Sequence, residues 1–230
     1  MMSLSIKKEY LLVVLLISLF FAKYLLEFNI KKDVPQSSLR QVTSYLSEND
    51  PEQAIFVALA VTFGFKEVAS DFLFIQAIQH FGDWKQKPEK RFEKIYPLLQ
   101  TISYTSVHFV PAYSFGALVL VELGYPDEAI KFLNTGIANN PRAFELWLYR
   151  DFTIRLFRNK EYKKAIEGME TALKIKDYPP ALERILAYAY EKDGQIGKAI
   201  GQWQRVYNST EDPAIKEICL RHIKNLNERR

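Results

Sequence analysis

The chain has 230 residues, of which 48% are hydrophobic and 25% charged, and this globular composition excludes a wholly disordered chain, a collagen-like fibre and a polytopic transporter. Its 31 basic and 27 acidic residues leave a formal net charge of +4, an excess too small to indicate a nucleic-acid partner. Nine Gly and ten Pro are few for this length and favour long helices over hairpin-rich β architectures, and the single Cys excludes an intrachain disulfide.

The first predicted element is a membrane-spanning helix. Lys7 and Lys8 precede a largely apolar stretch over residues 10–26. Seventeen residues give roughly 25 Å of helix, at the short end for a hydrocarbon layer of about 30 Å. The alternative is a cleaved secretory signal, but cleavage after Ala22 would put Phe20 where a small residue is needed. We therefore predict an uncleaved signal-anchor.

The orientation of this anchor is not decided by the positive-inside rule, because basic residues flank it on both sides. A short leading tail followed by the apolar segment favours an N-terminus in the cytoplasm, which leaves about 200 residues on the far side of the membrane. We expect a single-pass membrane protein whose soluble part is periplasmic if the source is bacterial.

The stretch 27–65 is predicted to be a linker followed by an apolar segment. Pro and Ser among charged residues indicate the linker, with one short helix near 39–46. Residues 54–65 carry no charge but are too few to span a bilayer, so we predict a buried core segment. A second membrane pass is the alternative.

An internal repeat occupies the second half of the chain. The pair Ala-Ile occurs at 129–130, 165–166 and 199–200, with separations of 36 and 34 residues. Each pair opens an apolar pattern at offsets 0, 1, 4, 7 and 8, which is one stripe of an α-helix. The stripes are Ala129, Ile130, Leu133, Gly136, Ile137; Ala165, Ile166, Met169, Ala172, Leu173; and Ala199, Ile200, Trp203, Val206, Tyr207. The period predicts units of a helix, a short turn and a second helix.

Several positions recur together around these stripes. They are Tyr113, Ala117, Gly124, Ala129, Gly136 and Pro141 in the first unit, and Ala187, Gly194 and Ala199 in the third. This pattern resembles the tetratricopeptide-repeat (TPR) family. In the second unit Asn159 fills the region of the turn glycine, Asp151 stands where a small residue is expected, and two extra residues are expected to lengthen the turn or the link. The resemblance implies an all-α, right-handed helical-hairpin solenoid.

A weaker hairpin precedes the three clear repeats and is interpreted as a divergent fourth. Its second helix, near 89–99, is expected to kink or end at Pro97. The predicted organisation is a tail over 1–9, the anchor over 10–26, the linker and apolar segment over 27–65, the divergent hairpin over 66–109, three TPR-like repeats over 110–213, and a capping helix and tail over 214–230.

No catalytic or metal-binding motif is recognisable in the sequence. HExxH, CxxC, GxSxG and Walker-type glycine loops are all missing. Cys219 and His222 lie three apart, but two ligands do not make a metal site, and a buried thiol is the better interpretation. Lysines near 160–176 alternate with acidic residues. We therefore predict a protein that is not an enzyme and takes no metal, cofactor or nucleic acid.

By the TPR resemblance, the first helix of each unit lines a concave face that holds a peptide or a partner helix. The partner-binding groove is assigned to Leu118, Val121, Glu122, Leu148, Phe152, Arg155, Arg184, Tyr188 and Glu191. We expect Leu148, Phe152 and Tyr188 to anchor a protein partner, unless they pack within their own hairpins. The two arginines favour an acidic segment.

The function predicted from these observations is a non-enzymatic, membrane-anchored interaction scaffold or assembly factor. The alternatives are a chaperone-like or import-receptor adaptor on the cytosolic side, and an accessory regulator of an enzyme complex. The paired Lys and Asn with which some TPR proteins grip a peptide C-terminus are not recognisable, so that role is not supported.

Overall fold

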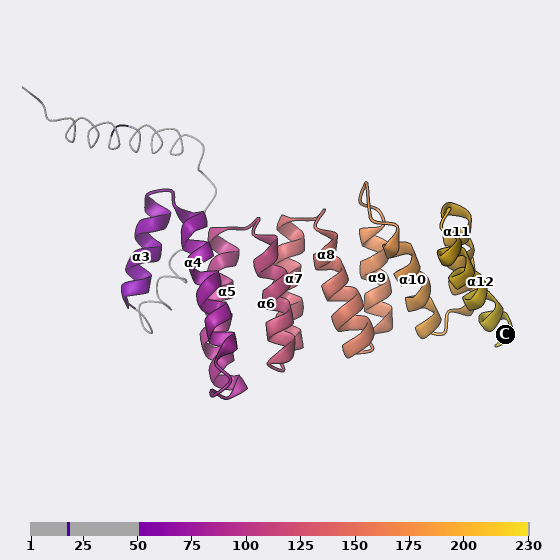
Figure 1. The fold of residues 1–230 in the computed structure, drawn as a ribbon, viewed down its shortest axis with the longest axis horizontal. Coiled ribbons are helices and arrows are strands. Elements are labelled where there is room, and N and C mark those ends of the chain that lie inside the picture. Colours follow the sequence, from indigo (N-terminus) through magenta and orange to yellow (C-terminus); the bar gives the residue numbers. More distant parts are fainter. Residues whose placement is uncertain (1–17, 19–50, 230) are drawn as a thin grey trace, which may run out of the picture.

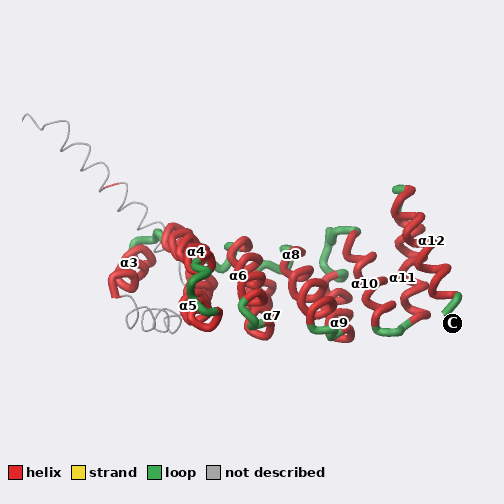
Figure 2. The backbone as a smooth tube through the Cα atoms, turned by 60° about the horizontal axis from the view of Figure 1, so that its bottom comes forward, coloured by secondary structure: helices red, strands yellow, loops and turns green. Residues whose placement is uncertain are grey.

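The computed structural model describes Ser18 and residues 51–229, and in this part of the chain the fold is all-α, without strands (Figure 2). The predicted fold class is confirmed at this level. Apart from Ser18, the predicted tail, anchor and linker helix lie outside the described residues. Within those residues, the helices are all too short or too polar to cross a bilayer.

Successive helices stand side by side in a single elongated row (Figure 1). The closest neighbours are the pairs α4–α5, α6–α7, η1–α9 and α10–α11, and α12 packs on α11. The described elements are α3 (Pro51–Thr62), α4 (Lys66–Gly82), α5 (Pro88–Thr105), α6 (Val110–Glu122), α7 (Pro126–Asn139), α8 (Phe144–Trp147), the π-helix η1 (Leu148–Arg158), α9 (Tyr162–Ala172), α10 (Ala181–Lys192), α11 (Ile196–Ser209) and α12 (Pro213–Asn227).

The core runs continuously along the row, where small residues let neighbouring helices approach. Ala129, Ala165 and Ala199 have no exposed surface, as their positions on the repeated stripe predict. A Cβ atom added at Gly136 would lie 2.7 Å from the Tyr113 ring, so this approach requires glycine. Close packing of small against aromatic side chains therefore sets the spacing between α6 and α7.

The turns inside the three repeats share one geometry. Each has three residues, 123–125, 159–161 and 193–195. The middle residue takes a left-handed conformation in all of them, with φ of 96° at Gly124, 56° at Lys160 and 75° at Gly194. Asn159 lies in the second of these turns, as predicted, but the left-handed position that glycine holds in the other two turns falls on the next residue. Lys160 occupies that place, five residues before Ala165, as the two glycines precede their own alanines.

The two extra residues of the second repeat lie inside its first helix, and the prediction that they lengthen the turn or the link is wrong. Residues 144–158 form one continuous first helix through α8 and η1, longer than α6 with 13 residues and α10 with 12. At its end the Asn159 amide bonds to the Ile154 carbonyl, five residues back, at 2.8 Å. A π-helix absorbs additional residues without changing the number of turns, and its bonds join residues five apart.

Pro97 does not end α5, because the helix continues to Thr105, so the predicted end at this residue is wrong. Leu98, Leu99 and Ile102 are buried in the core beyond it. Their burial stabilises the C-terminal half of α5 against the loss of one backbone hydrogen bond at the proline.

The apolar stretch 54–65 is mostly not the buried segment that its composition predicts. It forms most of α3, which packs on α4 through Val57 and Ala60. Ile55, Phe56 and Leu59 are exposed. A helix with one described neighbour buries one side only, so hydrophobic composition on all sides does not ensure burial.

Candidate protein-binding face

The nine residues predicted to line a groove lie on the first helices of the repeats, and none of them is buried. Leu118, Val121 and Glu122 are on α6, and Leu118 is the one large hydrophobic side chain exposed on that helix. The other six divide equally between η1 and α10, and they are Leu148, Phe152, Arg155, Arg184, Tyr188 and Glu191. The structure links Phe152 on η1 to Tyr188 on α10 through a third ring, that of Phe157.

An aromatic cluster, formed by Phe152, Phe157, Tyr188 and Lys192, joins η1 to α10. The Phe152 and Phe157 rings meet edge to face with centroids 4.7 Å apart, and Phe157 stacks on Tyr188 at 5.9 Å. The Lys192 ammonium lies 4.9 Å from the Tyr188 ring centroid, within range of a cation–π interaction. Phe157 is 54% exposed at the centre of this cluster. The face therefore offers an apolar platform beside a positive charge.

Phe157 was missed by sequence reasoning because it is five residues from Phe152. In an α-helix, side chains three and four apart are neighbours and those five apart diverge. The π-helix replaces that spacing with i→i+5 bonding and brings the two rings together. The only sequence signal for this arrangement is the enlarged repeat spacing of 36 residues.

Arg155 is held by a buried ion-pair network instead of standing free at the face. Its Nη1 donates to Asp151 Oδ1 at 2.8 Å. Arg150 donates to both oxygens of the same carboxylate, through Nε at 3.0 Å and Nη2 at 2.8 Å, and also to Asn134 Oδ1 at 2.8 Å. Substitution of Arg155 would therefore destabilise the interior of the second repeat, so a loss of binding in such a variant would not identify Arg155 as a partner contact.

Asp151 is fully buried, directly over Gly168 of α9. Burial raises the pKa of the Asp151 carboxyl above its ordinary value, while hydrogen bonds and charge from Arg150 and then Arg155 oppose the shift. A Cβ atom at residue 168 would overlap the carboxylate. The charged residue that departs from the TPR pattern is thus matched by a glycine on the opposing helix.

Glu191 is also occupied, by the last helix. Its Oε2 lies 2.8 Å from His222 Nδ1, and the His222 ring stacks on Trp203 with centroids 4.4 Å apart. Arg229 adds a longer ion pair at 3.9 Å. These contacts hold α12 against α10 and α11. The Glu191 carboxylate is therefore used in packing the last helix and is not available to a binding partner.

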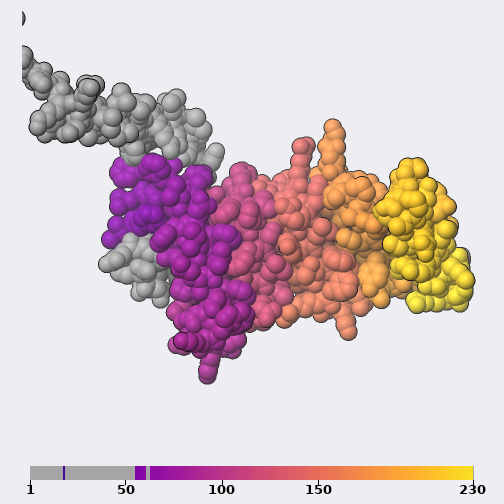
Figure 3. Space-filling model, viewed as in Figure 1, coloured from indigo at the N-terminus to yellow at the C-terminus, as the bar shows by residue number. Residues whose placement is uncertain are grey.

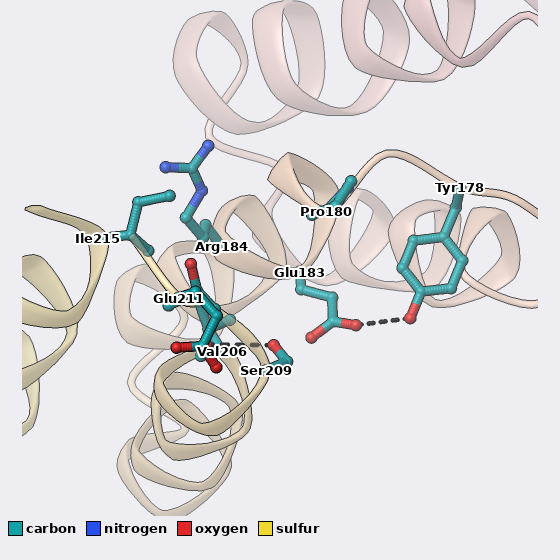
Figure 4. Close-up of a pocket in the computed structure, with 9 residues that line it drawn as sticks. Tyr178, Pro180, Glu183, Arg184, Val206, Ser209, Glu211 and Ile215 are labelled. Atoms are coloured by element: carbon teal, nitrogen blue, oxygen red, sulfur yellow. Dashed lines mark hydrogen bonds between the residues drawn. The ribbon is translucent and has the colours of Figure 1, made fainter. Parts of the chain in front are cut away.

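Arg184 lies in an open cleft of about 400 Å³ between α10, the end of α11 and the start of α12 (Figure 4). Its guanidinium is on the Ile215 side, and the Tyr178 hydroxyl donates to Glu183 Oε1 at 2.5 Å on the other. Glu183 and Glu211 line the same cleft. Because both signs of charge are present, the cleft shows no preference for an anion or a cation.

The described residues contain no group of three His, Cys, Asp or Glu side chains placed to hold a metal ion. Cys219 is buried, and burial raises the pKa of its thiol. A thiol held in its neutral form is a poor nucleophile.

Neither a protein-family model nor a curated protein sequence matches this chain.

Proposed function

We propose that this protein is a membrane-anchored interaction scaffold or assembly factor, built as a right-handed TPR-like helical-hairpin solenoid. The repeated three-residue turns with a left-handed central residue support the solenoid. The apolar segment over 10–26 supports the anchor. The short tail that precedes this segment favours an N-terminus in the cytoplasm, and the soluble part then lies on the far side of the membrane, which is the periplasm in a bacterium.

The observation that carries the binding proposal is the exposure of Phe157 between Phe152 and Tyr188. Aromatic side chains on a rigid helix lose little conformational freedom on binding, and they supply much of the contact energy once a partner excludes water. Lys192 beside the Tyr188 ring favours an acidic group near the anchor. We infer that the partner is a protein segment that carries a large apolar side chain next to an acidic one.

The test is recovery of binding partners from native membranes with the full chain. Phe157→Ala should weaken retention of a specific partner by roughly 30-fold or more, the effect of removing an aromatic hot spot. Leu220→Ala is the matched control, because Leu220 is equally exposed, at 53%, but lies on α12. Equal retention by both variants would exclude the aromatic cluster as the binding site.

Membrane orientation is tested separately, with protease added to intact cells or spheroplasts. Protection of the repeats from external protease in spheroplasts would favour the cytosolic adaptor over the scaffold on the far side. Digestion there, without lysis, is the result that this proposal predicts.

A further inference from the structure

An apolar end face closes the row of helices at its N-terminal end. It consists of six large side chains that are each 40–61% exposed: Ile55, Phe56 and Leu59 on α3, and Val68, Phe72 and Ile75 on α4. Figure 3 places α3 and α4 at the opposite end of the molecule from α12. The Phe56 and Phe72 rings touch edge to face at 5.2 Å, so the two helices contribute to one continuous surface.

The charged residues in the first half of α4 lie to one side of this face. Lys66, Glu67 and Asp71 line a hollow beside residues 106–109, at the junction of α5 and α6. Val68, Phe72 and Ile75 follow at spacings of four and three, which places them along one stripe of the helix. The apolar stripe and the charged edge of α4 are therefore on different sides of the helix.

The other end of the row is polar. On α12 the exposed residues include Glu217, Arg221 and Lys224, and Leu220 is the only large apolar side chain exposed on that helix. Stacked-repeat proteins need a polar outer surface on their terminal units to stay soluble, and α12 satisfies this requirement. The α3–α4 end does not, and a contiguous apolar patch of this kind marks an interaction surface.

We propose that the apolar end face lies in the interfacial layer of a lipid bilayer. This inference rests on the proposed anchor over 10–26. Only 24 residues, 27–50, separate that segment from Pro51, so even a fully extended connection would reach at most about 85 Å. A tether this short keeps the face at high local concentration beside the membrane, where apolar side chains enter the boundary of headgroups and acyl chains by about 5–10 Å.

The consequence is an oriented scaffold. With α3 and α4 on the bilayer, the row would extend from its membrane end through α6 and η1, so that the aromatic cluster stands beyond the lipid surface (Figure 1). A tether alone limits only the distance between the repeats and the membrane, whereas a tether together with a contacting face also fixes a direction. The face therefore determines how the binding site is presented.

The test uses the full chain reconstituted in phosphatidylcholine–phosphatidylglycerol vesicles, with Cys219→Ser as the background. A bimane label at Ile75→Cys is compared with one at Leu220→Cys, because the native side chains are 52% and 53% exposed. Brominated lipids should quench the label at position 75 at least twofold and leave the label at 220 unchanged. Iodide in the aqueous phase should show the opposite preference.

Every other outcome overturns the proposal in a different way. Iodide quenching at position 75 equal to that at 220 would leave the face in water. Shielding of position 75 from both quenchers would indicate a protein cover, such as another part of the chain or a second copy. Failure of the protein to float with vesicles would reject the anchor as well, whereas flotation without lipid quenching at 75 would reject only the end face.

A second variant guards against a label that itself inserts into lipid. Ile75→Glu, combined with a label at Leu59→Cys, should reduce lipid quenching at position 59 by at least half if the two residues share one lipid-facing surface. Helix content from circular dichroism should not change, because both side chains are exposed. Undiminished quenching in this variant would show that the label, and not the face, contacts lipid.

Discussion

The carboxylate of Asp151 lies against the α-carbon of Gly168, in the space that a side chain would otherwise fill. Because the two residues are on different helices, η1 and α9, each limits what the other position accepts. The glycine makes room for a buried charge, and the charge gathers Arg150 and Arg155 around it. This pair distinguishes the second repeat from the first and third, in which no such buried ion-pair network is described.

Gly168→Ala should lower the free energy of unfolding by about 1–3 kcal/mol, the usual cost of overpacking. Gly201→Ala is the control, since residue 201 is also helical and, apart from its own helix backbone, nothing lies within 4 Å of an added Cβ. That control should be neutral or stabilising by up to about 1 kcal/mol. Chemical denaturation measures both.

The same contact should couple the effects of substitutions at residues 151 and 168 on the free energy of unfolding. In the double variant Asp151→Ala with Gly168→Ala, the loss should be smaller than the sum of the single losses, because removal of the carboxylate vacates the space of the new methyl group. Additive losses would show that the contact does not limit residue 168.

The pH dependence of stability should carry the signature of Asp151. Because burial raises its pKa in the folded state, the folded protein binds more protons than the unfolded chain between the two pKa values. Stability from this group is therefore greatest at the acid end and falls as pH rises from about 4, the unfolded value, through the folded pKa. Asp151→Asn should abolish that component. A parent that instead gains stability relative to the variant with rising pH would reverse the sign and contradict this account.

Lys160 is expected to be a weak point in its turn. A residue with a Cβ atom in the left-handed region costs roughly 1–2 kcal/mol relative to glycine, part of which is offset by the greater freedom of glycine in the unfolded chain. Lys160→Gly should therefore raise the thermal midpoint, with a gain of up to about 1 kcal/mol. Gly124→Ala, at the equivalent position, should lower it. If both substitutions destabilise, the shared turn geometry is not the controlling factor.

Trp203 is 3% exposed on α11 and stacks on His222 of α12. Its replacement by Ala should cost about 3–5 kcal/mol, since both the buried ring and the contact that holds the last helix are lost. Trp84→Ala should cost about 1 kcal/mol or less, because Trp84 is 70% exposed. A Trp203 variant as stable as the parent would contradict the interpretation of α12 as a packed cap.

The repeat pattern predicts the all-α class and the buried alanines well, because both depend on side chains a few residues apart. Lys160 shows a first limit of sequence-based prediction. Its left-handed backbone conformation is imposed by the surrounding repeat, and a lysine gives no sequence signal for such a conformation. The π-helix shows a second, because the sequence signals it only as two extra residues, and the spacing does not say where in the unit they are absorbed. Phe157 joins the candidate face only as a result of that distortion, so local periodicity does not reveal it. Arg155 and Glu191 fall on the predicted helices, but Asp151 on the same helix holds Arg155, and His222 on α12 holds Glu191.

The most direct test of the binding proposal is site-specific photo-crosslinking in native membranes. A photoreactive phenylalanine analogue at Phe157 is compared with one at Lys131, a 71%-exposed side chain on the second helix α7. The account predicts a discrete crosslinked protein from position 157, none from position 131, and loss of the crosslink when Tyr188→Ala is added. Equal crosslinking from both positions, or a product from 157 that survives Tyr188→Ala, would contradict it.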